Sequence, residues 1–143
     1  MKIIFVCHGN ICRSVAAEVI AKEIIRKSHI KDVEVISRAL SYEETGNDIY
    51  PPMKRVLEAN GYHCERHYAQ RMERSEANDA DIIYYMDESN YRLLSYWFSD
   101  YLSKCHLLTE KVGGKIVSDP WYDHRFNQAF EEIEEAVKAI LLN

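Results

Sequence analysis

The chain has 143 residues, of which 47% are hydrophobic and 29% are charged, and its formal net charge at pH 7 is −5. This length and hydrophobic content predict one compact domain over residues 1–143 with a single core. The acidic balance argues against nucleic acid or an anionic membrane as a partner for the whole surface, but it is compatible with a local basic pocket for an anion.

The N-terminus and the cysteines bear on the compartment. Met1-Lys2 leads directly into a strand-like run, and no apolar run approaches the roughly 20 residues of a membrane span. Two disulfides could form among the four cysteines, but no secretory segment accompanies them. These cysteines are Cys7, Cys12, Cys64 and Cys105. We expect reduced thiols, a cytoplasmic location, no membrane partner and a monomeric state.

The first half of the chain alternates between strand-like and helix-like patterns. Residues 2–6 are rich in β-branched side chains and predict a strand, and residues 14–27 predict a helix with one apolar face. Residues 33–36 predict a second strand. A second helix follows and ends at Asn60-Gly61.

The second half continues the same alternation. Residues 81–86 predict a third strand, and a helix capped by Asp87 follows, with Trp97 expected in the core. Residues 105–108 predict a fourth strand. Residues 127–142 predict the last helix, because its apolar side chains form one stripe and its glutamates lie elsewhere.

Strands that alternate with helices predict an α/β fold. The expected architecture is a twisted, four-stranded parallel sheet with helices on both faces. Ligands of such sheets bind outside the carboxyl ends of the strands, where the loop from the first strand to the first helix lies. That loop has the sequence CHGNICR at residues 7–13.

The loop after the first strand has the composition of an anion site. Five residues separate Cys7 from Arg13, enough for the chain to curl into a cradle with its N–H groups inward at a helix N-terminus. Gly9 and Asn10 accept the unusual dihedral angles of a tight cradle. Arg13 supplies a planar fork for two phosphate oxygens. The predicted phosphate-binding residues are His8, Gly9, Asn10, Ile11, Cys12, Arg13 and Ser14.

A cysteine in such a cradle suits nucleophilic catalysis. Positive charge and a helix N-terminus favour the ionised thiol, so we expect Cys7 to be a thiolate that accepts a hydrogen bond from the Ser14 hydroxyl. Attack on a phosphate ester would give a cysteinyl-phosphate. The departing oxygen needs a general acid, and Asp119 is the candidate, with Trp121 and Tyr122 after it as surfaces for an aromatic ring.

The same residues allow other interpretations. A non-catalytic phosphate-binding module would keep the cradle and lose the nucleophile or the acid, whereas Cys7, Arg13 and Asp119 are all present. A metal site formed by Cys7, His8 and Cys12 would lack the paired spacing of structural zinc sites. The sequence therefore predicts no metal and no cofactor.

Three motifs, VCHGNICRS at 6–14, MDESN at 86–90 and DPWYD at 119–123, resemble those of the low-molecular-weight protein tyrosine phosphatases in order and spacing. The resemblance covers residues 2 to about 142. It implies a three-layer, flavodoxin-like fold and hydrolysis without a metal. It also implies a phosphotyrosine-containing protein or a small aryl phosphate as substrate, and inorganic phosphate or a similar oxyanion as product or inhibitor.

The resemblance assigns roles to the catalytic positions. It implies that Cys7 is the nucleophile, that Arg13 clamps the phosphate, and that Asp119 acts first as the acid and then as the base that activates water. It also implies that Cys12 closes a reversible disulfide with Cys7 and so protects the nucleophile from irreversible oxidation.

Five further positions match residues that support the site in this family. Asn10 and Ser14 are expected to hold the loop and the thiolate. His67, Asp87 and Asn90 are expected to form a polar cluster beneath the site.

Residues 11 and 37–46 bear on the choice of substrate. Relatives that act on phosphoarginine carry threonine at the position of Ile11, so isoleucine favours phosphotyrosine. An arsenate reductase of this fold would need two further cysteines after the third strand, and residues 86–101 contain none. Glu43 falls where the family commonly has an aromatic wall residue. Either Tyr42, one place away, takes that role beside Trp121 and Tyr122, or the specificity differs.

Overall fold

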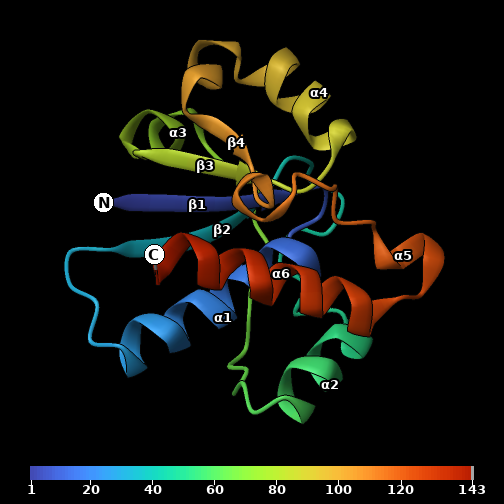
Figure 1. The fold of residues 1–143 in the computed structure, drawn as a ribbon. Helices are drawn as coiled ribbons and strands as arrows, with labels where there is room; N and C mark the ends of the chain where they lie inside the picture. The colour runs from blue at the N-terminus through green and yellow to red at the C-terminus, as the bar shows by residue number, and fades with distance from the viewer. Residues whose placement is uncertain (143) are drawn as a thin grey trace.

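A computed structural model describes residues 1–142, and its core element is the predicted four-stranded sheet (Figure 1). The strands are β1 (Lys2–Cys7), β2 (Glu34–Ala39), β3 (Ile82–Tyr85) and β4 (Cys105–Leu107). Their order is β2-β1-β3-β4, and every neighbouring pair is parallel. The predicted α/β architecture is confirmed, with β1 in the middle of the sheet.

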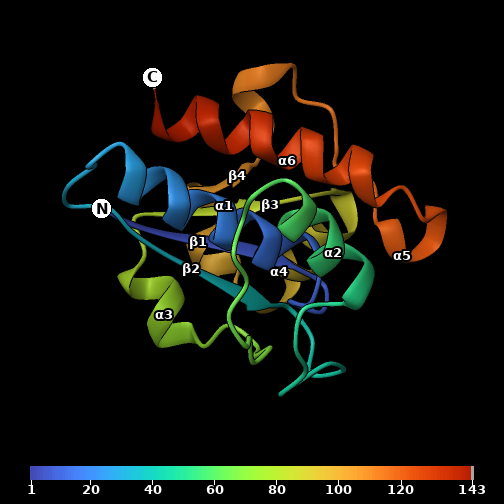
Figure 2. The ribbon, with the colours of Figure 1, turned by 90° about the horizontal axis from the view of Figure 1, so that it is seen from below.

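Helices cover both faces of this sheet. The helical elements are α1 (Arg13–Lys27), α2 (Pro51–Ala59), α3 (Arg74–Asp79), α4 (Glu88–Trp97), α5 (Pro120–Asp123) and α6 (Phe126–Leu141), together with the short 3₁₀ helices η1 (Ser99–Lys104) and η2 (Glu110–Val112). Helices α1 and α6 lie side by side on one face, with α2 packed against α6, as both ribbon views show (Figures 1 and 2). Helices α3 and α4 lie on the opposite face (Figure 1).

The alternation of side chains along β1 separates two hydrophobic clusters. Ile3, Phe5 and Cys7 join the cluster on the α1 and α6 face. Ile4 and Val6 point the other way, into the cluster under α3 and α4. Because successive side chains of a strand point to opposite faces, a strand buried on both sides must be apolar throughout. This requirement explains the run IIFVC.

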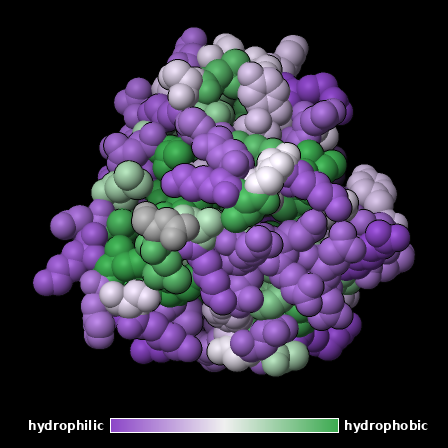
Figure 3. All heavy atoms as spheres, in the orientation of Figure 1, coloured by the Kyte–Doolittle hydropathy of each residue, from purple (hydrophilic) through white to green (hydrophobic). Residues whose placement is uncertain are grey.

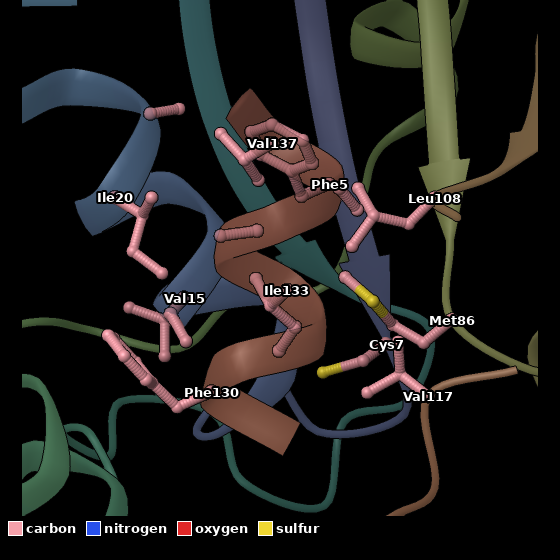
Figure 4. Packing of buried hydrophobic residues seen from close by; sticks show 14 of the residues in the cluster. Phe5, Cys7, Val15, Ile20, Met86, Leu108, Val117, Phe130, Ile133 and Val137 are labelled. Carbon is pink, nitrogen blue, oxygen red and sulfur yellow. The ribbon is translucent and has the colours of Figure 1, made fainter. Parts of the chain in front are cut away.

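The larger cluster also anchors the end of β1. Ile133 of α6 and Val15 of α1 lie in the interior of this cluster, and the Cys7 side chain lies at its edge beside Met86 and Val117 (Figure 4). Close packing leaves such side chains little freedom. The position of the Cys7 sulfur is therefore fixed by the core, although it lies where the strand meets the following loop.

Two helical predictions were wrong in detail. Helix α3 was not predicted because it has only six residues, and its capping box starts with Glu73 instead of a usual N-cap residue. Trp97 was expected in the core, but it is 51% exposed. The buried positions of this segment are Leu94 and Phe98, four residues apart, so Trp97 falls outside the buried stripe.

The exterior is mostly polar. Hydrophilic side chains cover much of the face seen in Figure 3, including the middle of α6, and apolar side chains show between them. Within residues 1–142, no helix combines the length and the hydropathy needed to pass through a lipid bilayer.

Candidate active site

The loop between β1 and α1 forms the floor of a cavity of about 360 Å³ at the carboxyl end of the sheet. The lining residues are Cys7, His8, Gly9, Ile11, Cys12, Arg13, Glu43, Glu44, Tyr50, Asp119, Trp121 and Tyr122. Since β1 has β2 on one side and β3 on the other, the loop lies at the point where the order of the strands reverses. Open α/β sheets bind ligands at this point, as the sequence predicted.

The backbone of this loop presents free hydrogen-bond donors. The Asn10 carbonyl accepts a bond of 2.7 Å from Nε2 of His67, and the Ile11 carbonyl accepts one of 2.7 Å from the Tyr50 amide. In contrast, the amides of residues 9–12 have no acceptor within residues 1–142. Polar backbone groups rarely remain without a partner, and consecutive free amides form an anion-binding nest. The loop therefore has the geometry of an anion-binding nest.

Asn10 holds the loop in shape. Its φ angle is +61°, a left-handed conformation that asparagine tolerates better than most residues. Its buried side-chain amide donates to Oγ of Ser14 and to Oγ of Ser37, both at 2.9 Å, and its Oδ1 accepts from the Gln70 amide at 3.2 Å. These contacts agree with the expectation that Asn10 helps to hold the loop. Ser37 was missed, because the predicted second strand ended at residue 36 and the burial of this serine is visible only in the structure.

Gly9 has a different role from the one predicted. It was expected to adopt an unusual backbone conformation, but of the two residues only Asn10 has a positive φ. A Cβ atom at Gly9 would lie 3.1 Å from Cγ of Glu44, which is tighter than ordinary van der Waals contact. Glycine leaves room here for the Glu44 side chain to pack directly against the loop.

The Cys7 sulfur lies among hydrogen-bonding groups that suit a thiolate. Its Sγ is 3.1 Å from Oγ of Ser14, and the Ser14 amide donates to it at 3.4 Å. Since α1 begins at Arg13, this amide belongs to the first turn, whose donors have no intrahelical acceptor and carry partial positive charge. The predicted contact between Cys7 and Ser14 is confirmed.

Arg13 is a buried cation that donates its hydrogen bonds through one terminal nitrogen, Nη1. Only 2% of it is exposed, and its Nη1 donates to Oδ2 of Asp87 at 2.7 Å and to the Val117 carbonyl at 2.8 Å. Burial opposes its charge, but the negative charges of Cys7, Asp119 and Asp87 raise the pKa of Arg13 above its usual value. The guanidinium therefore stays charged beside the loop.

Asp119 lies in the same cavity as Cys7 and Arg13. Its Oδ1 accepts from the Trp121 amide at 3.0 Å, which caps α5, and its Oδ2 is 3.5 Å from Nη2 of Arg13. Residues more than 100 positions apart in the chain are thus brought together around one cavity. Their juxtaposition permits nucleophilic attack and proton transfer on the same bound group.

The aromatic wall differs from the prediction. Trp121 and Tyr122 line the cavity as expected, and Tyr50, which was missed, lines it too, with its ring centroid 5.0 Å from that of Trp121. Tyr42 was predicted as a wall residue, but it does not line the cavity and is 72% exposed. The Arg71 guanidinium lies 4.9 Å from its ring and donates to its hydroxyl, which holds Tyr42 outside the site.

The predicted supporting cluster is divided into two parts. His67 bonds the loop at Asn10, and burial lowers the pKa of His67, so its ring is neutral at pH 7 and donates through Nε2. Asp87 holds Arg13, and its Oδ1 accepts from the Asn90 amide at 2.8 Å. No hydrogen bond joins His67 to Asp87 or Asn90 in the part of the chain that the structure describes. The expectation of one cluster was wrong, because His67 binds the loop at Asn10 whereas Asp87 binds Arg13 at the start of α1.

Cys12 also lines the cavity and differs in environment from Cys7. Burial and the adjacent Cys7 raise the pKa of Cys12, so it stays a neutral thiol. All four cysteines are free. Among residues 1–142, no three His, Cys, Asp or Glu side chains are placed so that they could hold a metal ion together, and this includes Cys7, His8 and Cys12.

Comparisons with known proteins agree with this geometry. A family described as low molecular weight phosphotyrosine protein phosphatase matches residues 2–143. Low molecular weight phosphotyrosine protein phosphatase 1 of Drosophila melanogaster is 32% identical over 98% of this chain and 94% of its own length.

Two solved structures share the fold. YfkJ from Bacillus subtilis has a TM-score of 0.93 at 24% identity, over 99% of this chain and 92% of that one. Vibrio vulnificus Wzb in complex with benzylphosphonate has a TM-score of 0.88 at 25% identity, over 99% of this chain and 97% of that one. The predicted fold class is thereby confirmed.

Proposed function

Because the chain belongs to the low molecular weight phosphotyrosine protein phosphatase family, we propose that it hydrolyses phosphotyrosine and small aryl phosphates through a cysteinyl-phosphate intermediate. One observation supports this most directly. The Cys7 sulfur lies in an anion cradle that also contains a buried Arg13, with Asp119 3.5 Å from that arginine. Nucleophile, phosphate clamp and acid therefore share one cavity.

In the first step, the free amides of residues 9–12 and Nη2 of Arg13 hold the phosphoryl oxygens. The Cys7 thiolate attacks phosphorus, so that a sulfur–phosphorus bond forms while the bond from phosphorus to the aryl oxygen breaks. Asp119 gives its proton to the departing oxygen, which leaves as a neutral phenol. Ser14, through its hydroxyl and its amide, stabilises the thiolate before attack.

In the second step, the Asp119 carboxylate takes a proton from a water molecule, whose oxygen attacks the phosphorus. The sulfur–phosphorus bond breaks, Cys7 returns as a thiolate and inorganic phosphate leaves. The Ser14 donors make the sulfur a better leaving group, because they favour its charged form. Aspartate returns to its protonated form and the cycle closes.

An aromatic substrate suits the walls of the cavity. The rings of Tyr50 and Trp121 stand beside the cradle, and Ile11 lines the same cavity. Aromatic side chains pack well against a phenyl ring. The benzylphosphonate in the Wzb complex carries its phosphonate on a phenyl ring through one methylene group, which supports phosphate esters with an aromatic ring as the substrate class.

We expect the purified protein to hydrolyse p-nitrophenyl phosphate and a phosphotyrosine peptide at mildly acidic pH, with a metal chelator present, at a kcat of at least about 1 s⁻¹. Because Ile11 and the aromatic wall favour a flat ring, the phosphotyrosine peptide should exceed a matched phosphoarginine peptide in kcat/KM by about tenfold or more. Release of inorganic phosphate measures both.

Two results would contradict this function. Binding of phosphate without hydrolysis of any ester would indicate a phosphate-binding module. A preference for phosphoarginine would indicate that the Ile11 position does not set the substrate class.

We further propose that Cys12 protects the nucleophile. Peroxide would oxidise the Cys7 thiolate to a sulfenic acid, and the Cys12 thiol would attack that sulfur, forming a disulfide and releasing water. Both sulfurs line one cavity, so Cys12 is the thiol placed nearest in the site to resolve the sulfenic acid of Cys7.

Cys12→Ser should therefore recover several-fold less activity than wild type when peroxide treatment is followed by dithiothreitol. Activity before and after each treatment measures this recovery. Cys64→Ser, which changes a buried thiol that does not line the cavity, should recover as wild type does. Equal recovery in Cys12→Ser and wild type would disprove the protective role.

We also propose that the enzyme acts in the cytoplasm as a monomer. Four unpaired thiols support a reducing compartment, since proteins in oxidising compartments usually pair their cysteines. The active-site residues described above all come from one chain, so the proposed reaction needs no second copy.

A further inference from the structure

Two carboxylates line the cavity that contains the phosphate cradle. Glu43 and Glu44 follow β2 in the segment that leads to α2, and both line the cavity together with Cys7. Oε2 of Glu43 is 3.0 Å from Nε2 of His8, and Oε2 of Glu44 accepts from Nδ2 of Asn47 at 2.7 Å. Each carboxylate is thus held at the rim by a neighbour. Glu43 and Glu44 are called the acidic rim below.

The acidic rim lies directly against the loop that would hold the phosphate. The stem of Glu44 packs closely against the loop, since its Cγ would lie 3.1 Å from a Cβ atom at position 9. Glu44 also borders a second hollow, and the two hollows share Ile11, Glu44 and Tyr50 as lining residues. A peptide that ran from the first cavity toward the second would cross Glu44 and then meet a hollow of mixed charge, lined by Lys54 and Arg55 as well as by Asp48 and Glu58.

These charges affect which substrates bind well. A phosphoryl group carries negative charge, and beside it the cavity contains the two glutamates and the cation of Arg13, while Asp119 carries the proton that it donates. Additional acidic side chains on the substrate would be repelled by the rim, whereas a lysine or arginine side chain would pair with it. Part of the rim is solvent-exposed, so the attraction is moderate and weakens with salt.

We propose that the acidic rim selects phosphotyrosine substrates that carry a lysine or arginine next to the phosphorylated residue. This inference rests on the proposed phosphatase function and adds the charge of the substrate's flanking residues to it. Glu43 and Glu44 act here as specificity-determining residues. They take no part in bond breaking.

The test compares two phosphotyrosine peptides that are identical except for lysines or glutamates on either side of the phosphotyrosine. In wild type at low salt, kcat/KM should be about fivefold to tenfold higher for the lysine peptide, which is the effect of two exposed ion pairs. The ratio should fall to about 1–2 in the double variant Glu43→Gln/Glu44→Gln. Because each ratio is measured within one variant, a general change in activity cancels.

A matched control removes one charge from the opposite end of the sheet. Glu34 is exposed at the first position of β2, so Glu34→Gln lowers the net negative charge without changing the rim, and the ratio should stay at the wild-type value. For wild type, the ratio of kcat/KM between the lysine and the glutamate peptide should also fall toward 1 in about 0.5 M salt. At that salt concentration the Debye length is only a few ångströms.

The possible failures separate the two proposals. Equal kcat/KM for both peptides, or a ratio that the double variant leaves unchanged, would overturn the role of the rim while the phosphatase function stands. Hydrolysis of neither peptide would overturn the phosphatase function and the rim proposal with it.

Discussion

Replacing Cys7 with serine should lower kcat for p-nitrophenyl phosphate by about 10⁴-fold or more, because losing a nucleophile removes the covalent route altogether. Serine fits the same space at the end of β1 and keeps a polar atom near Ser14. Its hydroxyl, however, is far less ionised than a thiol and leaves phosphorus less readily. Initial rates of p-nitrophenol release, measured with a metal chelator present, give the loss.

Two controls separate a lost nucleophile from a damaged protein. Cys105→Ser changes a thiol on β4 outside the cavity and should keep near wild-type activity. Cys7→Ser should still bind inorganic phosphate, since residues 9–12 and Arg13 are unchanged, and phosphate should raise its thermal midpoint. Residual activity above about one hundredth of wild type in Cys7→Ser would mean that another group attacks the phosphorus.

The strands and helices that were predicted most reliably are those in which burial decides the spacing of the apolar side chains. The run before Cys7 is apolar because β1 is covered on both faces, and the long helices α1 and α6 bury one stripe each against the sheet. These patterns depend on the period of the element alone, so they can be recognised without knowing the neighbours. The position of the loop from Cys7 to Arg13 at the carboxyl end of the sheet was predicted as well, because it follows from the order of strand and helix.

The aromatic walls of the cavity were predicted less well. Loops form these walls, and the course of each loop depends on contacts with residues that are far away in the sequence. Tyr42 was expected at the wall, but Arg71, 29 positions later, holds its ring outside. Tyr50 reaches the wall because its amide bonds the Ile11 carbonyl and its ring packs on Trp121. No local pattern signals such contacts.

Gly9 shows how a residue can be predicted as important for the wrong reason. A glycine in a tight loop suggests a special backbone conformation, yet here Asn10 adopts the left-handed conformation and Gly9 makes room for Glu44. Dihedral preference is a property of one residue and can be read locally. Close approach of a side chain from a segment more than 30 positions away cannot.

Arg13→Lys should lower kcat/KM for p-nitrophenyl phosphate by about 10³-fold, the lower end of the effect of an arginine in phosphoryl transfer. The guanidinium does two tasks at once. Nη1 is bonded to Asp87 and the Val117 carbonyl, while Nη2 stays available on the side of Asp119. A lysine ammonium is a point charge without a planar fork, so it cannot keep both anchors and also hold a phosphoryl oxygen in place.

Asp87→Asn is the matched control for the anchoring contact. Asparagine keeps the size of Asp87 but has only one acceptor oxygen, so it can accept from Nη1 of Arg13 or cap α4 but not both, and it removes the negative charge. We expect a loss of about tenfold, well below that of Arg13→Lys, because the fork itself is retained. Thermal unfolding of both variants shows whether the fold is intact, and the inhibition constant for inorganic phosphate reports the clamp directly. If Arg13→Lys binds phosphate and turns over substrate within tenfold of wild type, positive charge alone would be sufficient and the anchored guanidinium fork would have no catalytic role.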